Sequence, residues 1–154
     1  MAITAAQWKR AVAPVLPDPT SWTFRNKIAY RQPVGWVLLG VLGEGSGWQR
    51  DQVYIWSLVM PLYVESKHLV LSYSQRVAPA GTFGLHNQEA FRGAVASAVA
   101  ALPSEDQALR QLAAGTSEGS AGARVLLERG EEPGPEVDDL QAARTATAIA
   151  LGIR

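Results

Sequence analysis

All twelve aromatic residues of this 154-residue chain lie between Trp8 and Phe91, and residues 92–154 contain none. Five of the twelve are tryptophans, four are tyrosines and three are phenylalanines. Aromatic and β-branched residues favour strands, whereas alanine favours helices. We therefore expect the chain to change near residue 91, from an aromatic-rich part that forms a sheet to an Ala-rich part that forms helices.

The composition indicates a folded globular chain. Hydrophobic residues make up 47% of the sequence and charged residues 18%, and the net charge is zero. The length suits a single domain over residues 1–154, with the aromatic part at 1–91 and the helical part at 92–154. Basic residues slightly outnumber acidic ones in the first part and acidic residues outnumber basic ones in the second. This weak asymmetry differs from the dense basic patch of a dedicated nucleic-acid binder.

The chain has no cysteine, which excludes disulfides, thiolate nucleophiles and cysteine-based metal centres. Its first ten residues lack the order of basic region, apolar region and cleavage site that marks a secretory signal. The longest apolar runs, residues 34–42 and 53–64, are too short or too interrupted to span a bilayer. We expect a cytoplasmic protein that does not associate with membranes.

The hydrophobic periodicity predicts one helix and then four strands. Residues 4–13 have helical composition and end near Pro14. Residues 21–31 and 68–76 alternate between apolar and polar side chains. Residues 36–42 are apolar on both faces, as in a central strand, and residues 53–63 are rich in Val, Ile, Tyr and Trp, which favour strands. The short connections favour a four-stranded antiparallel meander.

Capping signals predict helices after the sheet, and a loop over residues 78–84 is expected to separate the two. Asn87 is a candidate N-cap, and Ser104 with Gln107 forms a capping box. A weaker helix is expected near residues 119–129, and a last one begins near Pro135. The predicted fold is therefore α+β: an N-terminal helix, the meander, and three or four C-terminal helices packed on the sheet. The helix from Asn87 to Leu102 is expected to cover one sheet face.

No pattern of catalytic or metal-binding residues stands out. The nucleophile elbow G-x-S-x-G does not occur, and Gly45-Ser46-Gly47 is best interpreted as a hairpin loop. The two histidines, His68 and His86, lack metal-ligand spacing. We predict no catalytic residue, no metal and no cofactor, and favour a non-enzymatic protein, although the sequence leaves an activity with dispersed acid and base residues open.

Two features are candidate partner-binding surfaces. The first is a basic row on one face of the strand 21–31, formed by Arg25, Lys27 and Arg31, with Arg50 on a nearby loop. Such a row also serves to protect a sheet edge from aggregation. The second is Trp48, which follows a Gly-rich loop and either anchors a partner or packs back over the sheet. The sequence does not indicate which sheet face is exposed.

The segments Phe24-Arg25-Asn26-Lys27, Tyr30-Arg31 and Val59-Met60-Pro61-Leu62-Tyr63 resemble small uncharacterised bacterial α+β domains, some of which occur near toxin and immunity loci. The resemblance covers residues 16–75 and assigns no catalytic residue. We expect a non-enzymatic protein that binds another protein, as an immunity-type or accessory partner, because catalytic motifs are absent and the first strand has an aromatic, partly basic face. The alternative is a small-molecule or nucleic-acid binding module that uses the basic, aromatic strand face. The oligomeric state stays open.

Overall fold

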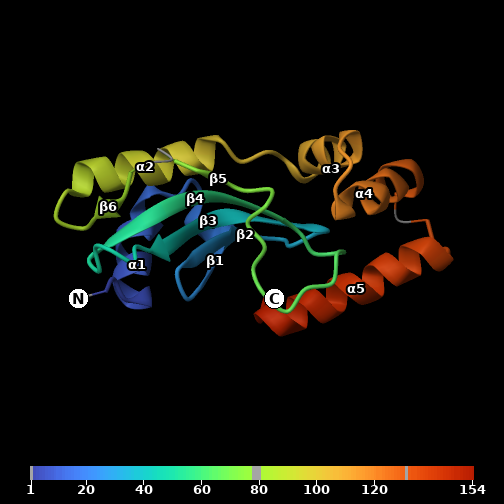
Figure 1. Cartoon of the computed structure of the whole chain (residues 1–154), viewed down its shortest axis with the longest axis horizontal. Helices are drawn as coiled ribbons and strands as arrows, with labels where there is room; N and C mark the ends of the chain where they lie inside the picture. The colour runs from blue at the N-terminus through green and yellow to red at the C-terminus, as the bar shows by residue number, and fades with distance from the viewer. Residues whose placement is uncertain (1, 78–80, 131) are drawn as a thin grey trace. The chain divides into compact units, whose positions relative to one another are not determined.

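The computed structural model describes residues 2–77, 81–130 and 132–154, which form two compact units (Figure 1). The first unit comprises the described residues of 1–33, 39–58 and 73–102, and the second comprises those of 34–38, 59–72 and 103–154. The compositional change at residue 91 does not separate the units. Residues 92–102 belong to the first unit, and two segments of the aromatic part belong to the second.

The first unit begins with helix α1, Ala5–Val12, close to the predicted range. Thr4 and Gln7 form a capping box, in which the Gln7 backbone N–H donates to Thr4 Oγ1 at 3.1 Å and the Thr4 N–H donates to Gln7 Oε1 at 2.9 Å. One face of α1 carries Trp8 and Val12, both fully buried. The 3₁₀ turn η1, Ala13–Val15, follows and contains Pro14.

A second 3₁₀ turn, η2, Pro19–Ser21, leads into the sheet. Its polar residues are held by Asp18, whose carboxylate accepts hydrogen bonds from the Ser21 and Thr20 hydroxyls, each at 2.6 Å. These bonds favour the charged carboxylate and lower the pKa of Asp18 below its usual 3.8.

The predicted strand 21–31 is in fact a hairpin of two strands, β1, Trp22–Arg25, and β2, Ile28–Arg31. The chain reverses at Asn26, whose φ of 52° lies in the left-handed region that asparagine adopts more readily than most residues. The prediction of one continuous strand was wrong. The apolar and polar alternation does not reveal a two-residue turn, since the same period continues on both sides of it.

Within the described residues the sheet has six strands. Next to β1 and β2 come β3, Val37–Gly45, β4, Gln52–Pro61, and β5, Gln75–Arg76, in that order, and β6, Phe83–Gly84, pairs separately with β4. The two central strands agree with the prediction: β3 is Val37–Gly45 and β4 is Gln52–Pro61. The strand predicted over residues 68–76 was wrong except at its end, where Gln75–Arg76 forms β5. This segment has a period of two, but a strand also needs a partner edge, and β4 offers it only Trp56 and Ser57.

The loop predicted before the helices, residues 78–84, contains β6, Phe83–Gly84. Residues 78–80 of that prediction lie outside the described residues. Helix α2, Gln88–Ala100, then follows the predicted N-cap, with the Ala90 N–H donating to Asn87 Oδ1 at 3.2 Å. An α+β fold with an N-terminal helix, an antiparallel sheet and C-terminal helices is therefore confirmed, with six strands in place of four.

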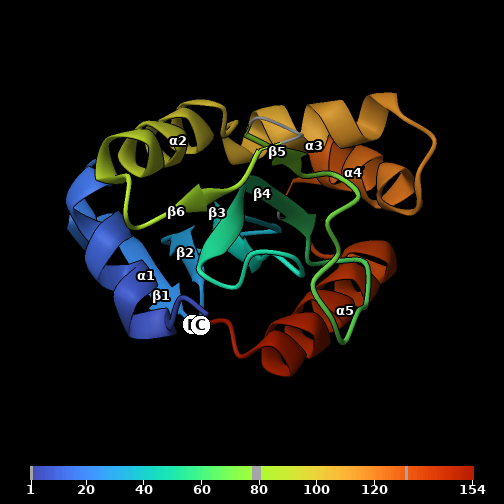
Figure 2. The same ribbon diagram turned by 60° about the vertical axis from the view of Figure 1, so that its left-hand side comes forward.

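Helix α2 covers the sheet as predicted. It buries Phe91, Ala94, Val95 and Ala98, and the Ser57 hydroxyl of β4 donates to the Ala98 carbonyl at 2.5 Å. The Phe91 ring also meets the Trp8 ring edge to face, with centroids 5.8 Å apart. Figure 2 shows α1 and α2 meeting at one side of the strands of this unit.

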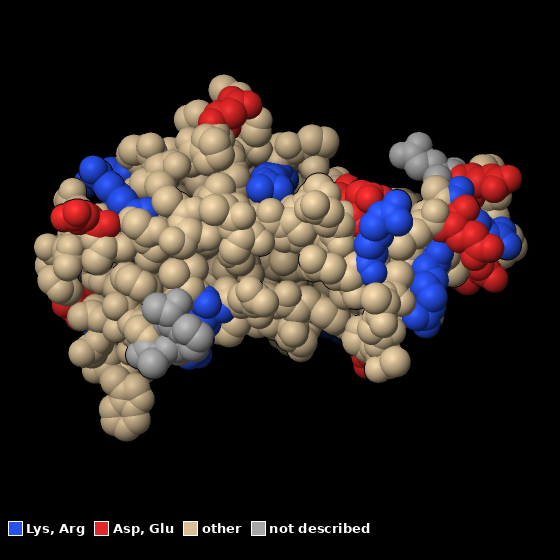
Figure 3. All heavy atoms as spheres, turned by 90° about the horizontal axis from the view of Figure 1, so that it is seen from above, with Lys and Arg blue, Asp and Glu red and all other residues tan. Residues whose placement is uncertain are grey.

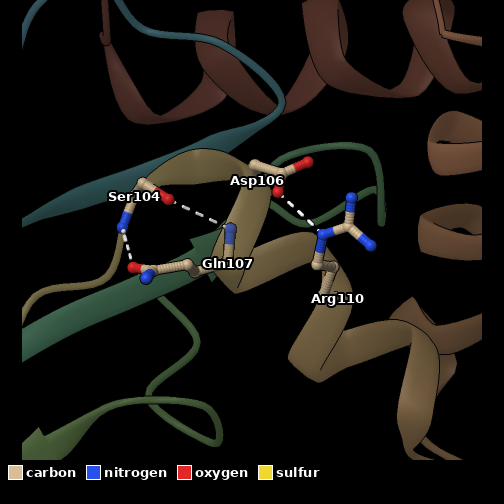
Figure 4. A network of polar contacts seen from close by, with 4 residues as sticks. All are labelled: Ser104, Asp106, Gln107 and Arg110. Atoms are coloured by element: carbon tan, nitrogen blue, oxygen red, sulfur yellow. Dashed lines mark hydrogen bonds and ion pairs between the residues drawn. The ribbon is translucent and has the colours of Figure 1, made fainter.

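The described residues of the second unit form three helices: α3, Glu105–Ala114, α4, Glu118–Arg129, and α5, Pro135–Leu151. The predicted capping box at the start of α3 is confirmed (Figure 4), with the Gln107 N–H donating to Ser104 Oγ at 3.1 Å and the Ser104 N–H to Gln107 Oε1 at 2.9 Å. One turn later Arg110 donates to Asp106 at 2.7 Å, and this carboxylate raises the pKa of Arg110.

Helices α3 to α5 pack on segments 34–38 and 59–72 of the second unit. The Tyr63 hydroxyl donates to the Gly119 carbonyl of α4 at 2.7 Å, and a side chain at Gly122 would collide with the Tyr63 ring. Arg144 of α5 donates to the carbonyls of Gly35 at 2.5 Å and Val34 at 2.7 Å. Within the second unit, α3 to α5 are therefore held by residues 34–38 and 59–72.

Across the described ranges, every helix is too short or too polar to span a lipid bilayer.

Figure 3 shows how charge is distributed on one face of the molecule. Over the helices of the second unit, basic and acidic side chains alternate on the face drawn and do not form a field of one sign. Such mixed charge is typical of an exposed helical surface.

Candidate functional site

The loop between β3 and β4 is held in one conformation by Ser46. The Ser46 hydroxyl, largely buried, accepts hydrogen bonds from the backbone N–H groups of Trp48 at 3.3 Å and Gln49 at 3.1 Å. The Ser46 N–H donates to the Gln52 carbonyl at 3.1 Å, and the Gln52 N–H donates to the Gln49 carbonyl at 3.0 Å. Ser46 therefore acts as a turn residue, in agreement with the hairpin-loop interpretation.

A second contact ties this loop to the segment before β6. The Thr82 hydroxyl lies 3.0 Å from Gln49 Oε1 and also contacts the side-chain amide of Gln52. β6 itself pairs with the first residues of β4, with Val53 opposite Phe83. The loop is thus supported from its own backbone and from a neighbouring segment.

Trp48 projects from this supported loop with 94% of its surface exposed. The alternative that it packs back over the sheet is therefore wrong. Burial of the exposed indole by a partner would contribute a favourable free energy of roughly 25 cal/mol for each Å² of apolar surface removed from water. Since the loop holds the Trp48 backbone in place, less conformational entropy is lost when the side chain meets a partner than with a mobile loop.

The structure separates the predicted basic row. In the β1–β2 hairpin, Trp22 is opposite Arg31 and Arg25 is opposite Ile28. Directly opposed residues share a face and successive residues alternate, so Arg25 and Arg31 lie on opposite faces. Lys27 belongs to the turn. The prediction that the three lie in one row on one face was wrong, because it assumed a single strand.

Arg31 also lies at the other end of the hairpin from the turn. Its guanidinium is stacked over the Trp22 ring, 5.8 Å from the centroid. Arg31 therefore helps to cover this core tryptophan and lies outside the candidate site.

Four of the five predicted residues gather at one end of the first unit. The Gly43 N–H of β3 donates to the Lys27 carbonyl at 2.9 Å, which places the β1–β2 turn beside the end of β3 where the Trp48 loop begins. Lys27 Nζ would be 3.7 Å from a side chain at Gly45. We name Arg25, Lys27, Trp48 and Arg50 the turn-end surface.

The turn-end surface combines one large apolar side chain with three cationic ones. Trp48, Arg25 and Arg50 are exposed and Lys27 is partly so. Asp51, next to Arg50, is also exposed and offsets part of the positive charge. Chemically, this surface can insert an indole into an apolar pocket and attract acidic groups around it.

The two histidines lie in different units, His68 in the second and His86 in the first. Within the part of the chain that the structure describes, no three His, Asp or Glu side chains are placed to hold a metal ion. His86 packs its ring close to Gly84, where an added Cβ would collide with it.

A cation–π contact of Arg76 was missed by the sequence analysis. Arg76 of β5 lies over the rings of Tyr54 and Trp56 on β4, 4.0 and 4.9 Å from their centroids. The contact depends on the register of β5, in which Arg76 is opposite Trp56. The sequence predicted a strand over residues 68–76, but it did not indicate which residue of β4 lies opposite Arg76.

Comparisons with known proteins give no relative from which a site could be transferred. No protein-family model matches the chain, and no curated protein and no solved structure is similar to it. The function must therefore be argued from the surface itself.

Proposed function

We propose that the chain is a non-enzymatic protein-binding protein, an accessory or immunity-type partner that binds through its turn-end surface. The exposure of Trp48 on a hydrogen-bonded loop carries this proposal. Exposed and preorganised tryptophans are typical anchors of protein interfaces, where they fill a pocket of the partner. The immunity-type assignment within this class rests on the sequence resemblance alone.

The cationic residues around Trp48 indicate the chemistry of the partner. Arg25 and Arg50 are exposed, so an acidic rim around the pocket that receives Trp48 would complement them. Charges at the edge of an interface mainly affect the association rate, whereas the buried anchor sets the dissociation rate. We therefore expect Trp48 to determine how long the complex lasts and the arginines how fast it forms.

Coexpression with the products of neighbouring genes, followed by affinity capture on the tagged chain, tests the proposal. Trp48→Ala is expected to weaken the complex by about 30-fold or more, since an interface hot spot contributes at least about 2 kcal/mol. Measuring dissociation by surface plasmon resonance would locate the change in the off-rate.

Ile149→Ala is the matched control. Ile149 is the other large apolar side chain that is strongly exposed among the described residues, at 75%, and it lies on α5 in the second unit. Its removal is expected to leave the complex intact. Unchanged binding in Trp48→Ala, or the same loss in Ile149→Ala, would contradict the assignment of Trp48 as the anchor. Turnover in a broad substrate screen would contradict a non-enzymatic role.

The occurrence of three cationic residues at the same end of the first unit as an exposed aromatic ring favours a second candidate, a nucleic-acid binding module. Bases would stack on Trp48 while Arg25 and Lys27 neutralise phosphates. A single-stranded oligonucleotide is then expected to bind with an affinity that falls steeply as salt increases, and Arg25→Ala with Lys27→Ala should abolish the binding. Binding that is absent at low salt would remove this candidate, and Arg110→Ala, in the second unit, serves as the charge-matched control.

A further inference from the structure

A groove of about 390 Å³ lies between α1 and α2 of the first unit. Its apolar base is formed by Ala11 of α1, Phe91 of α2 and Leu85 of the segment before α2. Phe91 is almost fully buried, so it forms a firm floor, whereas Ala11 and Leu85 are partly exposed. The size is within the range of small-molecule sites, roughly 300–1,000 Å³.

Two arginines, one from each helix, border this groove. Arg10 of α1 and Arg92 of α2 both line it and are both exposed. Neither forms an ion pair or a side-chain hydrogen bond with any residue in the described ranges. Glu89 precedes Arg92 by three residues on α2 but is not among the residues that line the groove. The positive charges of Arg10 and Arg92 are therefore not neutralised by an ion pair with any described residue.

Two glutamines add uncharged donors to the same groove. The Gln7 side chain accepts the Thr4 N–H through Oε1, which leaves its amide N–H groups available to another acceptor. Gln88 lines the groove from the first turn of α2, at the positive end of the helix dipole. Both contributions, like those of the arginines, favour a negatively charged ligand.

We propose that this groove binds a small organic anion with an apolar body. Its oxyanion group, a carboxylate or a phosphate, lies between Arg10 and Arg92, and its apolar part covers Phe91 and Leu85. A guanidinium group can form two parallel hydrogen bonds with either a carboxylate or a phosphate, so both head groups fit between the two arginines. The site is distinct from the turn-end surface and does not depend on the proposed function.

Titrations followed by ¹H–¹⁵N NMR on the intact chain test the site, with benzoate and phenyl phosphate as the two anionic probes and benzyl alcohol as the neutral one. Both anions are expected to shift the amide signals of Ala11, Leu85 and Gln88 in a saturable manner. The more tightly bound of the two identifies the preferred head group. Benzyl alcohol is expected to bind at least tenfold more weakly than either.

Arg10→Gln and Arg92→Gln are each expected to weaken anion binding by about tenfold or more, since a charge-assisted hydrogen bond is lost in each. Both side chains are exposed, so the variants should fold, and their spectra without ligand report this directly. Arg110→Gln, at an exposed arginine of α3 in the second unit, is the matched control and should bind normally.

Three results would overturn the proposal. The first is the absence of saturable shifts at Ala11, Leu85 and Gln88 with either anion up to tens of millimolar. The second is equal binding by the doubly substituted Arg10→Gln, Arg92→Gln chain. The third is equal binding of benzyl alcohol and benzoate, which would show that the groove selects apolar surface and not charge.

Discussion

Trp8→Ala is expected to destabilise the first unit by about 3–5 kcal/mol, the usual cost of truncating a buried large aromatic residue. Trp8 is fully buried and links three elements of this unit. It projects from α1, packs edge to face on Phe91 of α2, and lies so close to Gly43 of β3 that an added Cβ there would collide with the indole ring. Its loss therefore leaves a cavity that no single element can close.

Two further variants sharpen this prediction. Trp48→Ala removes the same atoms from a side chain that is 94% exposed, so the free energy of unfolding should change by less than about 0.5 kcal/mol. Trp8→Phe should cost far less than Trp8→Ala, because Trp8 Nε1 is buried without a hydrogen-bond partner among the described residues and phenylalanine removes that unsatisfied donor. Urea denaturation followed by circular dichroism measures all three. Equal losses in Trp8→Ala and Trp48→Ala would contradict the role of Trp8.

Gly40→Ala is the second large effect, expected to cost about 3 kcal/mol. Gly40 lies in β3 directly opposite Tyr30 of β2. An added Cβ would come 2.9 Å from the Tyr30 Cα and would also collide with the Ala29 carbonyl oxygen. Both contacts are with backbone atoms, which cannot rotate away, so the β2–β3 pairing itself would have to shift.

Gly93→Ala is the matched control. Gly93 lies on the exposed face of α2, and an added Cβ would meet nothing within 4 Å. Alanine is favoured over glycine inside a helix by about 1 kcal/mol, so this variant should be slightly more stable than the parent. The thermal unfolding temperatures of Gly40→Ala and Gly93→Ala compare the cost of the steric collision in β3 with the gain in helix propensity in α2. A neutral Gly40→Ala would show that β2 and β3 can adjust their spacing.

The sequence determined the helix boundaries well. The predicted Asn87 N-cap and the Ser104–Gln107 capping box were both found, and α5 begins at Pro135. These signals are local: a cap is decided by residues three positions apart, and the chain can satisfy it without reference to distant segments. The strands β3 and β4 were also predicted, β3 from an apolar run that requires burial on both faces and β4 from residue types that favour strands.

The candidate site was predicted only in part. The sequence singled out Trp48 and the cationic residues around it, but it left open whether Trp48 was exposed, and it placed Arg25 and Arg31 on one face. The turn at Asn26 moved them to opposite faces and ends. A one-residue change in the position of a turn redirects every side chain beyond it, which the alternating pattern by itself does not record.

By itself the sequence determined an α+β chain with aromatic strands, capped helices and no cysteine chemistry. Only the tertiary structure decided which tryptophan is core and which is surface: Trp8 has no exposed area, and Trp48 is almost wholly exposed. It also brought Arg10 and Arg92 to one groove. The physical reason is the same in each case, since burial and charge proximity depend on packing between segments far apart in the chain, whereas caps and periodicity are set by near neighbours.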